Sequence, residues 1–290
     1  MIDILYEISD ISIKISSLAI KSLIYEFNHF PSLGLVCASS NGSHDDMDVF
    51  TFIDSTSSLI KPFILCAEAG FKRNSLEALF KEIREIGILG EKDMFISTKG
   101  VNTHKGTLFI LGILCAATTR CLYENRDFLY IRSIVKSMTK DLSKLELELL
   151  NKDKKDLTHG EEIYNKYRIK GIREEAERGF PIIFESALDA YSKSKSKNDR
   201  LVYTLISIIK HCTDTNIIYR CGIDCLLDVQ NKAKRIIKAY DVSDELYKKS
   251  VEEFNNYLIE NKISPGGSAD ILSATIFLHE IREKFFKISR

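Results

Sequence analysis

The segment TKGVNTHKG (98–106) combines, between two apolar stretches with a helical pattern, the residue types that bind phosphate. Lys99 and Lys105 supply positive charge, Asn102 supplies an amide, and two glycines let a ligand approach the backbone. The segment is not a Walker A loop, because its second lysine precedes the glycine and no strand pattern comes before it. We expect Asn102 or Thr103 to cap a helix that begins near Lys105, where free amide groups and both lysines would bind a phosphate. The alternative is a capped turn with two solvated lysines.

The segment SPGGSADIL (264–272) has a similar form. Ser268 is the predicted N-cap of a helix, and Asp270 falls in its first turn, where an acid complements the helix dipole. In the alternative interpretation, Gly266 and Gly267 let the backbone approach a ligand while Asp270 binds a metal ion.

The densest cluster of acids is SHDDMD, in which Asp45, Asp46 and Asp48 follow His44. Three carboxylates this close repel one another, so a cation or a helix N-terminus should relieve them. Oxygen ligands suit Mg²⁺, which commonly accompanies nucleotide phosphates. The alternative is an acidic start to a helix that contains the apolar run VFTFI.

The pair His44–Asp45, with His29 upstream, also matches the dipeptide of the helical HD-type metal-dependent phosphohydrolases. Those enzymes need a further His and a distant Asp at their metal ions. We keep this class as an alternative.

Two further segments carry charged or polar groups. In GIREEAERGFP, Arg173 could bind a phosphate, and Glu175 is a candidate general base or metal ligand; both could instead be helix-surface ions. In DTN, Asp214 and Asn216 predict an Asx turn or a ligand contact, and Arg220 follows them.

The cysteines predict neither a zinc site nor a disulfide framework. The set His211, Cys212, Cys221 and Cys225 lacks the C-x-x-C pairs of structural zinc sites, and Cys225 fits a buried position in a helical pattern. The chain has seven cysteines, an odd number without paired spacing, so we expect reduced thiols.

The elements that must position these residues are helices. Apolar residues step by three and four from Ile4 to Tyr25, and the same period recurs along the chain. No strand pairs are recognisable, so we expect an all-α fold: one compact domain over residues 1–290, with the functional loops converging on one cleft. The predicted helices cover about 4–25, 76–86, 107–124, 128–150, 183–195, 199–212, 222–240, 244–260 and 271–285.

The amino-acid composition limits the classes of binding partner that we expect. Lys+Arg and Asp+Glu both number 41, so net charge gives no reason to expect a nucleic-acid or anionic-membrane partner. We find no secretory signal and judge no apolar run long enough to cross a bilayer. The sequence therefore predicts a cytoplasmic protein.

Five of these segments, taken together, indicate a protein family more specifically than any one of them does alone. The blocks GSHxDMD, TKGVNTHKG, GxRxEAxxGFP, DTN and SPGGSAD occur in this order between residues 31 and 272. In this the chain resembles the triphosphoribosyl-dephospho-CoA synthase family.

The resemblance implies an all-α transferase. In that family the 2′-hydroxyl of 3′-dephospho-CoA attacks the anomeric carbon of the ATP ribose, adenine leaves, and the triphosphate is retained. The family's product is the precursor of the prosthetic group of citrate lyase or malonate decarboxylase, which a second enzyme attaches to an acyl carrier protein. A triphosphate calls for Mg²⁺ and basic side chains.

We assign roles to this chain's residues from that chemistry. Glu175 is the predicted base for the 2′-hydroxyl, and His44 the predicted acid for adenine. The predicted metal ligands are Asp46 with Asp48 or Asp270, and Asp270 also counts among the catalytic residues. The predicted ATP-binding and phosphate-binding residues are Lys99, Lys105, Arg173, Asn102, His104, Asp214, Gly266 and Gly267.

The chain departs from the family pattern at several positions. Ser32 and Cys37 stand where the pattern PKPGLVD has a lysine and an acid. Tyr219 and Cys221 replace a His and a Gly after DTN, and Glu174 replaces a Gly. A slow enzyme, an altered substrate preference and a nucleotide- or CoA-binding helical protein without turnover are therefore also open.

Overall fold

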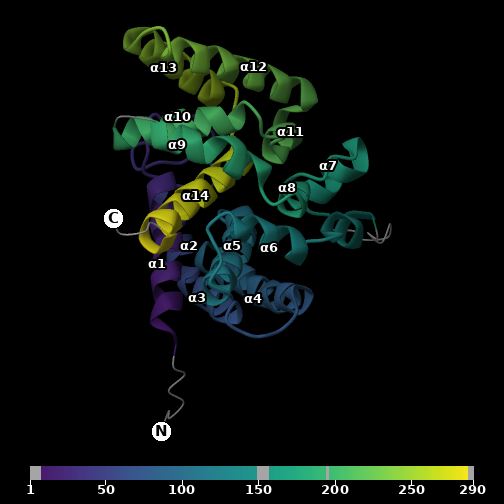
Figure 1. Ribbon diagram of the computed structural model, residues 1–290. Coiled ribbons are helices and arrows are strands. Elements are labelled where there is room, and N and C mark those ends of the chain that lie inside the picture. The colour runs from purple at the N-terminus through teal and green to yellow at the C-terminus, as the bar shows by residue number, and fades with distance from the viewer. Residues whose placement is uncertain (1–7, 149–156, 194–195, 287–290) are drawn as a thin grey trace.

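The computed structural model describes residues 8–148, 157–193 and 196–286 (Figure 1). Within these ranges the chain forms helices and no strand, and the one bridge between extended residues joins Cys37 to Ser40. The predicted all-α class is confirmed. The assignment of all of residues 1–290 to one domain stays a prediction, and Ile4 lies outside the described residues.

Fourteen α-helices occur in the described part of the chain. They are α1 (Asp10–Glu26), α2 (Val49–Ser58), α3 (Ile60–Ala69), α4 (Leu76–Ser97), α5 (Lys105–Tyr123), α6 (Tyr130–Met138), α7 (His159–Tyr167), α8 (Ile172–Glu177), α9 (Leu188–Lys193), α10 (Lys197–Ile209), α11 (Thr215–Cys221), α12 (Ile223–Tyr240), α13 (Asp244–Glu260) and α14 (Gly266–Ile281). Three five-residue π-helical segments occur at Lys144–Glu148, Ile183–Ala187 and Arg282–Phe286.

The helix predicted over 128–150 is shorter than expected. It ends at Met138, and Asp141 then takes a left-handed conformation with φ of 60°, which few residues other than glycine adopt. The predictions also missed helices α3, α7, α8 and α11 and gave α2 only as an alternative; these five helices have six to ten residues each. Helices of two or three turns show too few apolar repeats for the period to stand out.

The centre of the molecule is built by α5 and α14. Helix α5 packs against α1, α3, α4, α6 and α14, so nearly all of its faces are buried. Figure 1 shows α14, in yellow, between the pair α12–α13 and the helices α2–α6. One hydrophobic core extends from Ile15 in α1 to Ile281 in α14. A helix that is apolar all round, as these two are, is what a central position requires.

Two helical stretches reach the length and mean hydropathy of a membrane span, contrary to the expectation from the sequence. They are Val49–Gly70, with 22 residues and a mean hydropathy of 1.3, and Lys105–Tyr123, with 19 residues and 1.5. In the second stretch 78% of the most apolar window is buried inside the fold. Its central position in the core accounts for its apolar composition.

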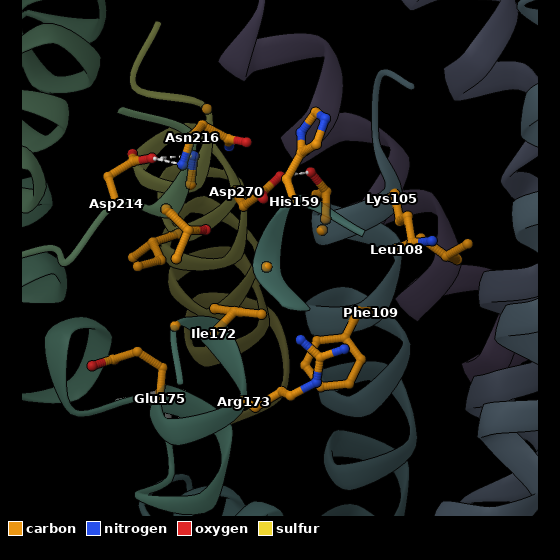
Figure 2. Close-up of a pocket in the computed structure, with 18 of the residues that line it drawn as sticks. Lys105, Leu108, Phe109, His159, Ile172, Arg173, Glu175, Asp214, Asn216 and Asp270 are labelled. Atoms are coloured by element: carbon orange, nitrogen blue, oxygen red, sulfur yellow. Dashed lines mark hydrogen bonds between the residues drawn. The ribbon is translucent and has the colours of Figure 1, made fainter. Parts of the chain in front are cut away.

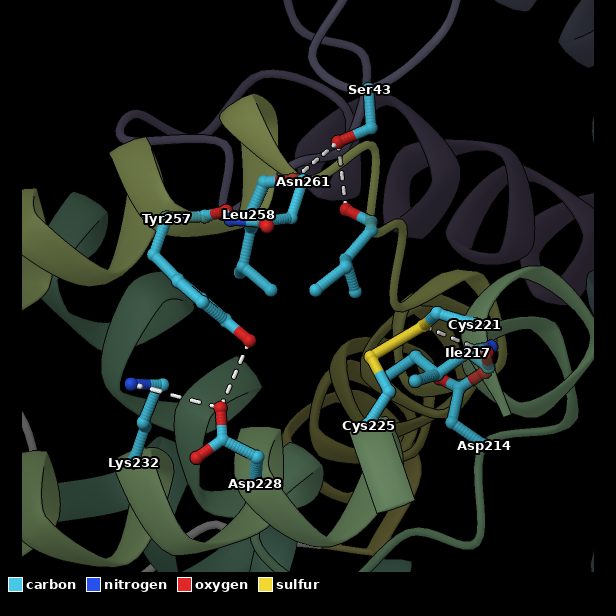
Figure 3. Close-up of a disulfide and its surroundings, with 11 residues drawn as sticks. Ser43, Asp214, Ile217, Cys221, Cys225, Asp228, Lys232, Tyr257, Leu258 and Asn261 are labelled. Atoms are coloured by element: carbon cyan, nitrogen blue, oxygen red, sulfur yellow. Dashed lines mark hydrogen bonds and ion pairs between the residues drawn. A yellow bond between two sulfur atoms is a disulfide. The ribbon is translucent and has the colours of Figure 1, made fainter. Parts of the chain in front are cut away.

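The expectation of reduced thiols is wrong for two cysteines. Cys221 at the end of α11 and Cys225 in α12 form a disulfide with a Cα–Cα distance of 5.8 Å (Figure 3). The disulfide uses both Cys221 and Cys225, so these two sulfurs cannot bind a zinc ion. The five remaining cysteines are free and buried, which is the usual state of a small apolar side chain in a core.

Candidate active site

One large cavity, of about 1740 Å³, lies among α1, α4, α5, α8, α11 and α14. Each of the five segments noted in the sequence contributes residues to its wall: 35–47, 102–108, 168–182, 211–220 and 264–271. Pockets for a single drug-sized ligand have volumes of roughly 300–1,000 Å³. This cavity therefore has room for two substrates.

The N-terminus of α5 opens on the cavity, but it is capped differently from the prediction. The N-cap residue is His104, whose side chain makes no capping hydrogen bond, and Thr103 instead donates to Ser55 Oγ at 2.6 Å. Lys105 lines the cavity, and its Nζ lies 2.6 Å from Glu91 Oε1. Lys99 follows the end of α4 with a φ of 54° and is not among the lining residues. Only one of the two predicted lysines faces the cavity.

His104 is a buried, neutral imidazole in the cavity wall. Ser55 Oγ lies 2.7 Å from its Nδ1, and the ring of Phe52 packs edge-on with a centroid distance of 4.9 Å. Burial lowers the pKa of His104 to about 3, so it carries no charge at neutral pH. Its Nε2 is buried without a hydrogen-bond partner among the described residues. A ligand that enters the cavity could satisfy this atom.

Asp270 lies against the first turn of α5 (Figure 2). A Cβ atom at Gly106 would lie 2.0 Å from Asp270 Oδ2, so only glycine permits this approach. Thr107 Oγ1 donates a hydrogen bond to Asp270 Oδ1. Burial is the main cause of the high pKa of Asp270, which rises from 3.8 to about 7. Asp270 is therefore a carboxyl that titrates near neutral pH inside the cavity.

Glu26, the last residue of α1, is a cavity residue that the sequence analysis missed. Its side chain is only 4% exposed. Burial, and then the charge of Asp270, raise the pKa of Glu26 well above its ordinary value. The signal was present in the sequence, because Glu26 continues the buried stripe Ile15, Ala19 and Ser22 at helical spacing. An acid on an otherwise buried helix face needs a functional or structural explanation.

Asp214 joins α11 to the start of α14. Its Oδ1 accepts from the amides of Asn216 at 3.0 Å, Ile217 at 3.4 Å and Gly267 at 3.3 Å. Its Oδ2 accepts from the amide and the hydroxyl of Ser268 at 2.7 and 2.9 Å. The predicted Asx turn at 214–216 is thus confirmed. Both oxygens of this 1%-exposed carboxyl are occupied, so Asp214 is a structural link within the cavity wall.

The prediction that Ser268 is the N-cap of α14 is wrong. The helix begins at Gly266, and Pro265 is its N-cap without a side-chain bond. Asp214, which belongs to another segment, caps the helix instead by accepting hydrogen bonds from the amides of Gly267 and Ser268. A Cβ atom at Gly267 would lie 3.1 Å from Asp214 Oδ1, and one at Gly266 would lie 2.7 Å from Asn216 Nδ2. Both glycines line the cavity, and both are needed for this close contact between loops.

The three acids of SHDDMD do not converge on one cation. Asp45 pairs with Lys262 at 2.8 Å, on the surface. Asp48 is the N-cap of α2 and accepts from the amide of Thr51 at 2.9 Å, which confirms the alternative of a helix start. Asp48 is not among the lining residues, whereas Asp46 lines the cavity with its side chain 64% exposed. A metal ion held jointly by Asp46 and Asp48 finds no support in this arrangement.

His44 is held neutral. Arg220 Nη2 lies 3.3 Å from its Nδ1, and since a guanidinium only donates, Nδ1 accepts and Nε2 carries the proton. Nε2 then donates to Ser264 Oγ at 2.8 Å. Burial, followed by the charge of Arg220, lowers the pKa of His44. At neutral pH its one proton lies in the hydrogen bond to Ser264, and it holds no second proton to release as an acid.

The metal constellation of an HD-type hydrolase is not seen. His29 is fully buried, and its Nδ1 contacts the backbone oxygen of Glu26. In the part of the chain that the structure describes, no three His, Cys, Asp or Glu side chains form a group suited to a metal ion. Nothing in the site favours the hydrolase alternative.

A basic wall faces the cavity from α4 and α8. Arg173 Nε lies 2.7 Å from Glu146 Oε2, and Arg84 Nη2 lies 3.0 Å from Glu146 Oε1. One carboxylate therefore holds two guanidinium groups in place. Other basic side chains in the wall were not singled out as phosphate ligands from the sequence: Arg84, Arg168, Lys170, Arg178 and Arg220. Phosphate oxygens could replace the carboxylates as partners of these groups.

Glu175 follows Arg173 on α8 and lines the same cavity. Its Oε2 accepts from the amide of Ile182 at 3.4 Å. Burial raises the pKa of Glu175. A carboxylate with a raised pKa is a stronger proton acceptor, as a general base requires.

The departures from the family pattern differ in their distance from the cavity. Ser32 and Cys37 are buried and are not among the lining residues, although Leu35 and Val36 between them are. Tyr219 does line the cavity and stacks on His159 with ring centroids 3.6 Å apart. Glu174 also lines it, whereas Cys221 is in the disulfide. The change at 219 is therefore the one that offers a ligand an aromatic face.

Known proteins support the family resemblance directly. Residues 12–288 match the family of ATP:dephospho-CoA triphosphoribosyl transferases. Three similar relatives carry the name "probable 2-(5''-triphosphoribosyl)-3'-dephosphocoenzyme-A synthase". One from Lactiplantibacillus plantarum is 40% identical over 90% of this chain and 94% of its own length. One from Streptococcus pyogenes is 37% identical over 91% of this chain and 95% of its own length. One from Malonomonas rubra is 33% identical over 98% of this chain and 93% of its own length.

No solved structure matches the chain significantly. The family match covers α1 to α14 and includes every segment that lines the cavity. The chain belongs to the ATP:dephospho-CoA triphosphoribosyl transferase family.

Proposed function

We propose that this protein transfers the 5-triphosphoribosyl group of ATP to the 2′-hydroxyl of 3′-dephospho-CoA and releases adenine. The observation that carries the proposal is the single cavity of about 1740 Å³, in which all five family segments meet. Both substrates are nucleotides, and both must lie in one cavity for the transfer to occur. The volume meets that requirement.

The wall of the cavity suits two anionic nucleotides. Lys105 and Arg173 would bind phosphates by leaving Glu91 and Glu146, with which they form ion pairs. The stacked rings of His159 and Tyr219 offer an aromatic surface to an adenine base. Asn102 also lines the cavity and would orient ribose hydroxyls.

The reaction balances without an oxidant or reductant. A bond forms between the 2′-oxygen of dephospho-CoA and C1′ of the ATP ribose, and the bond from C1′ to N9 of adenine breaks. The 2′-hydroxyl loses one proton and adenine gains one. We assign the first proton transfer to Glu175, because its raised pKa favours proton uptake. His44 is neutral, and its Nε2 proton would bind adenine by leaving Ser264 Oγ, its partner in the structure.

The family implies Mg²⁺, and the donor set of the cavity fits it. Mg²⁺ commonly binds one or two protein carboxylates together with substrate phosphates, so a cage of three side chains is not required. Asp270 and Asp46 both line the cavity, and Asp270 lies beside the N-terminus of α5. When bound there, the ion would neutralise charge on the triphosphate.

The product would pass to a second enzyme that attaches it to the acyl carrier protein of citrate lyase, in the cytoplasm. ATP and dephospho-CoA are both cytoplasmic metabolites, which supports that location. Neither nucleic acid nor a membrane is needed by this chemistry, and the chain has equal numbers of basic and acidic residues.

The test is one incubation of the purified protein with ATP, Mg²⁺ and 3′-dephospho-CoA, followed by mass spectrometry. We expect free adenine and a dephospho-CoA adduct heavier by one triphosphoribosyl group. Free phosphate without the adduct would instead indicate a hydrolase. Bound ATP with no product would indicate a binding protein without turnover.

Replacing Lys105 with Ala should weaken ATP binding by about tenfold or more, since a hydrogen bond to a charged group contributes about 1.5–3 kcal/mol. The melting temperature should change little, because the pair with Glu91 is partly exposed and such pairs contribute about 1 kcal/mol or less. Calorimetric titration with ATP and a thermal melt measure the two effects. Lys99→Ala is the matched control, because Lys99 does not line the cavity. Equal ATP affinity in both variants would contradict the phosphate role of Lys105.

A further inference from the structure

Glu26, which is buried, and Asp270, which is half-buried, are two acids of the same cavity wall without a basic partner among the described residues. Asp270 accepts from Thr107, whereas no hydrogen bond or ion pair to the Glu26 carboxyl is found among the described residues. Both residues line the cavity on helices that pack against each other, and after burial the charge of Asp270 contributes to the raised pKa of Glu26. By contrast, four other acids of the cavity each have a donor or a cation beside them: Glu91, Glu146, Glu175 and Asp214.

The pair lies where three helix ends meet. Glu26 is the last residue of α1, Gly106 and Thr107 are in the first turn of α5, and Asp270 is near the start of α14. These three helices pack against one another in the core. The N-terminal ends of α5 and α14 carry partial positive charge, which favours a phosphate group beside the acids.

Two ionised carboxylates in such a place repel one another and lose hydration, so they require a proton or a cation between them. Oxygen ligands and the lack of a nitrogen or sulfur ligand favour Mg²⁺ over transition metals. Two carboxylates plus substrate phosphates are a usual set for Mg²⁺ in nucleotide sites. Glu26 supplies the second observation beyond acidity, because it is a 4%-exposed, unpartnered carboxyl in the cavity wall.

We propose that Glu26 and Asp270 together hold the divalent cation that brings the ATP triphosphate to the N-terminus of α5. The assignment rests on the proposed function for the identity of the phosphate ligand. It replaces Asp46 and Asp48 as the principal metal ligands. Asp48 is engaged with Thr51 and is not among the lining residues, and Asp46 is exposed next to His44. Lys105, one residue before Gly106, would then contact the same triphosphate.

The test uses Mn²⁺ as a paramagnetic stand-in for Mg²⁺ and needs no turnover. The full-length protein is titrated with Mn²⁺ without nucleotide, and free Mn²⁺ is measured by electron paramagnetic resonance. We expect one site per chain, weakened at least tenfold in Glu26→Gln and in Asp270→Asn. Asp45→Asn is the matched control, because Asp45 is a surface acid paired with Lys262, and it should bind Mn²⁺ like the wild type.

Several outcomes would overturn the assignment. Unchanged Mn²⁺ binding in both Glu26→Gln and Asp270→Asn would do so, as would the absence of a site in the wild type. Loss of the site in Asp46→Asn alone would place the ion in the acidic cluster. Thermal melts in EDTA identify a variant that does not fold, and the other variant then decides. A wild type that binds Mn²⁺ at this pair but releases no adenine would refute the proposed transferase and leave the cation site intact.

Discussion

The variant Asp270→Asn is expected to melt at a higher temperature than the wild type at pH 8, yet to form product about a hundredfold more slowly or less. The slow turnover follows from the loss of a carboxylate that the proposed metal site requires, since even changes in outer-shell partners of a metal typically cost about 10–100-fold. The gain in stability follows from removing a half-buried, desolvated carboxylate that has no positive partner among the described residues.

The pH dependence of this gain has a defined sign. Asp270 has a pKa of about 7 in the folded protein, against an ordinary value of 3.8. Between these values the folded protein binds the proton and the unfolded chain does not, so the free energy of unfolding falls as pH rises. The full difference corresponds to about 4 kcal/mol, reached above pH 7. Asparagine does not ionise and has no such cost, so the free energies of unfolding of wild type and variant should converge near pH 4.

Thermal melts of both proteins in EDTA between pH 4 and pH 8 measure this effect. The adenine-release assay gives the rate on the same samples. Asp45→Asn is the control, since Asp45 lies on the surface and should change neither quantity much. A melting-temperature difference that does not grow with pH would show that burial does not raise the pKa of Asp270.

Replacing Asp214 with Ala should cause the largest loss of stability, of about 3 kcal/mol or more, because hydrogen bonds to a charged group contribute about 1.5–3 kcal/mol and buried donors would lose their partner. The carboxyl accepts from four amides and one hydroxyl on two segments. For a chain of this size the melting temperature should fall by on the order of 6 °C. Activity should fall as well, because the start of α14 carries Asp270.

Denaturant titration monitored by circular dichroism gives the free energy of unfolding. Asp48→Ala is the matched control, because Asp48 caps only its own helix, α2, and loss of such a cap costs about 1 kcal/mol. The difference between the two variants isolates the link between α11 and α14. Equal losses in both variants would mean that the bonds from Asp214 to Gly267 and Ser268 add no stability.

The sequence by itself determined the helical class and the identity of the segments that form the site. Apolar residues at helical spacing must be buried, so α5, α10, α12, α13 and α14 could be located to within about five residues, whereas α4 runs eleven residues beyond its predicted end. Glycines with polar and charged neighbours marked the segments that line the cavity. The family resemblance followed from the order of those segments. These features depend on the spacing of residues along the chain, which can be read directly from one sequence.

The tertiary structure decided which side chains meet. Lys99 and Lys105 look equivalent in the sequence, but the turn after α4 directs only the second into the cavity. Asp48 and Asp214 became helix caps, and Ser268 lost its predicted capping role to a residue of another segment. Glu26 joined the site although it lies outside every motif noted in the sequence. Packing between helices that are distant in the chain decides how deeply an acid is buried and which groups it contacts. These two factors set its pKa, and the spacing of neighbouring residues does not reveal which partners it will meet.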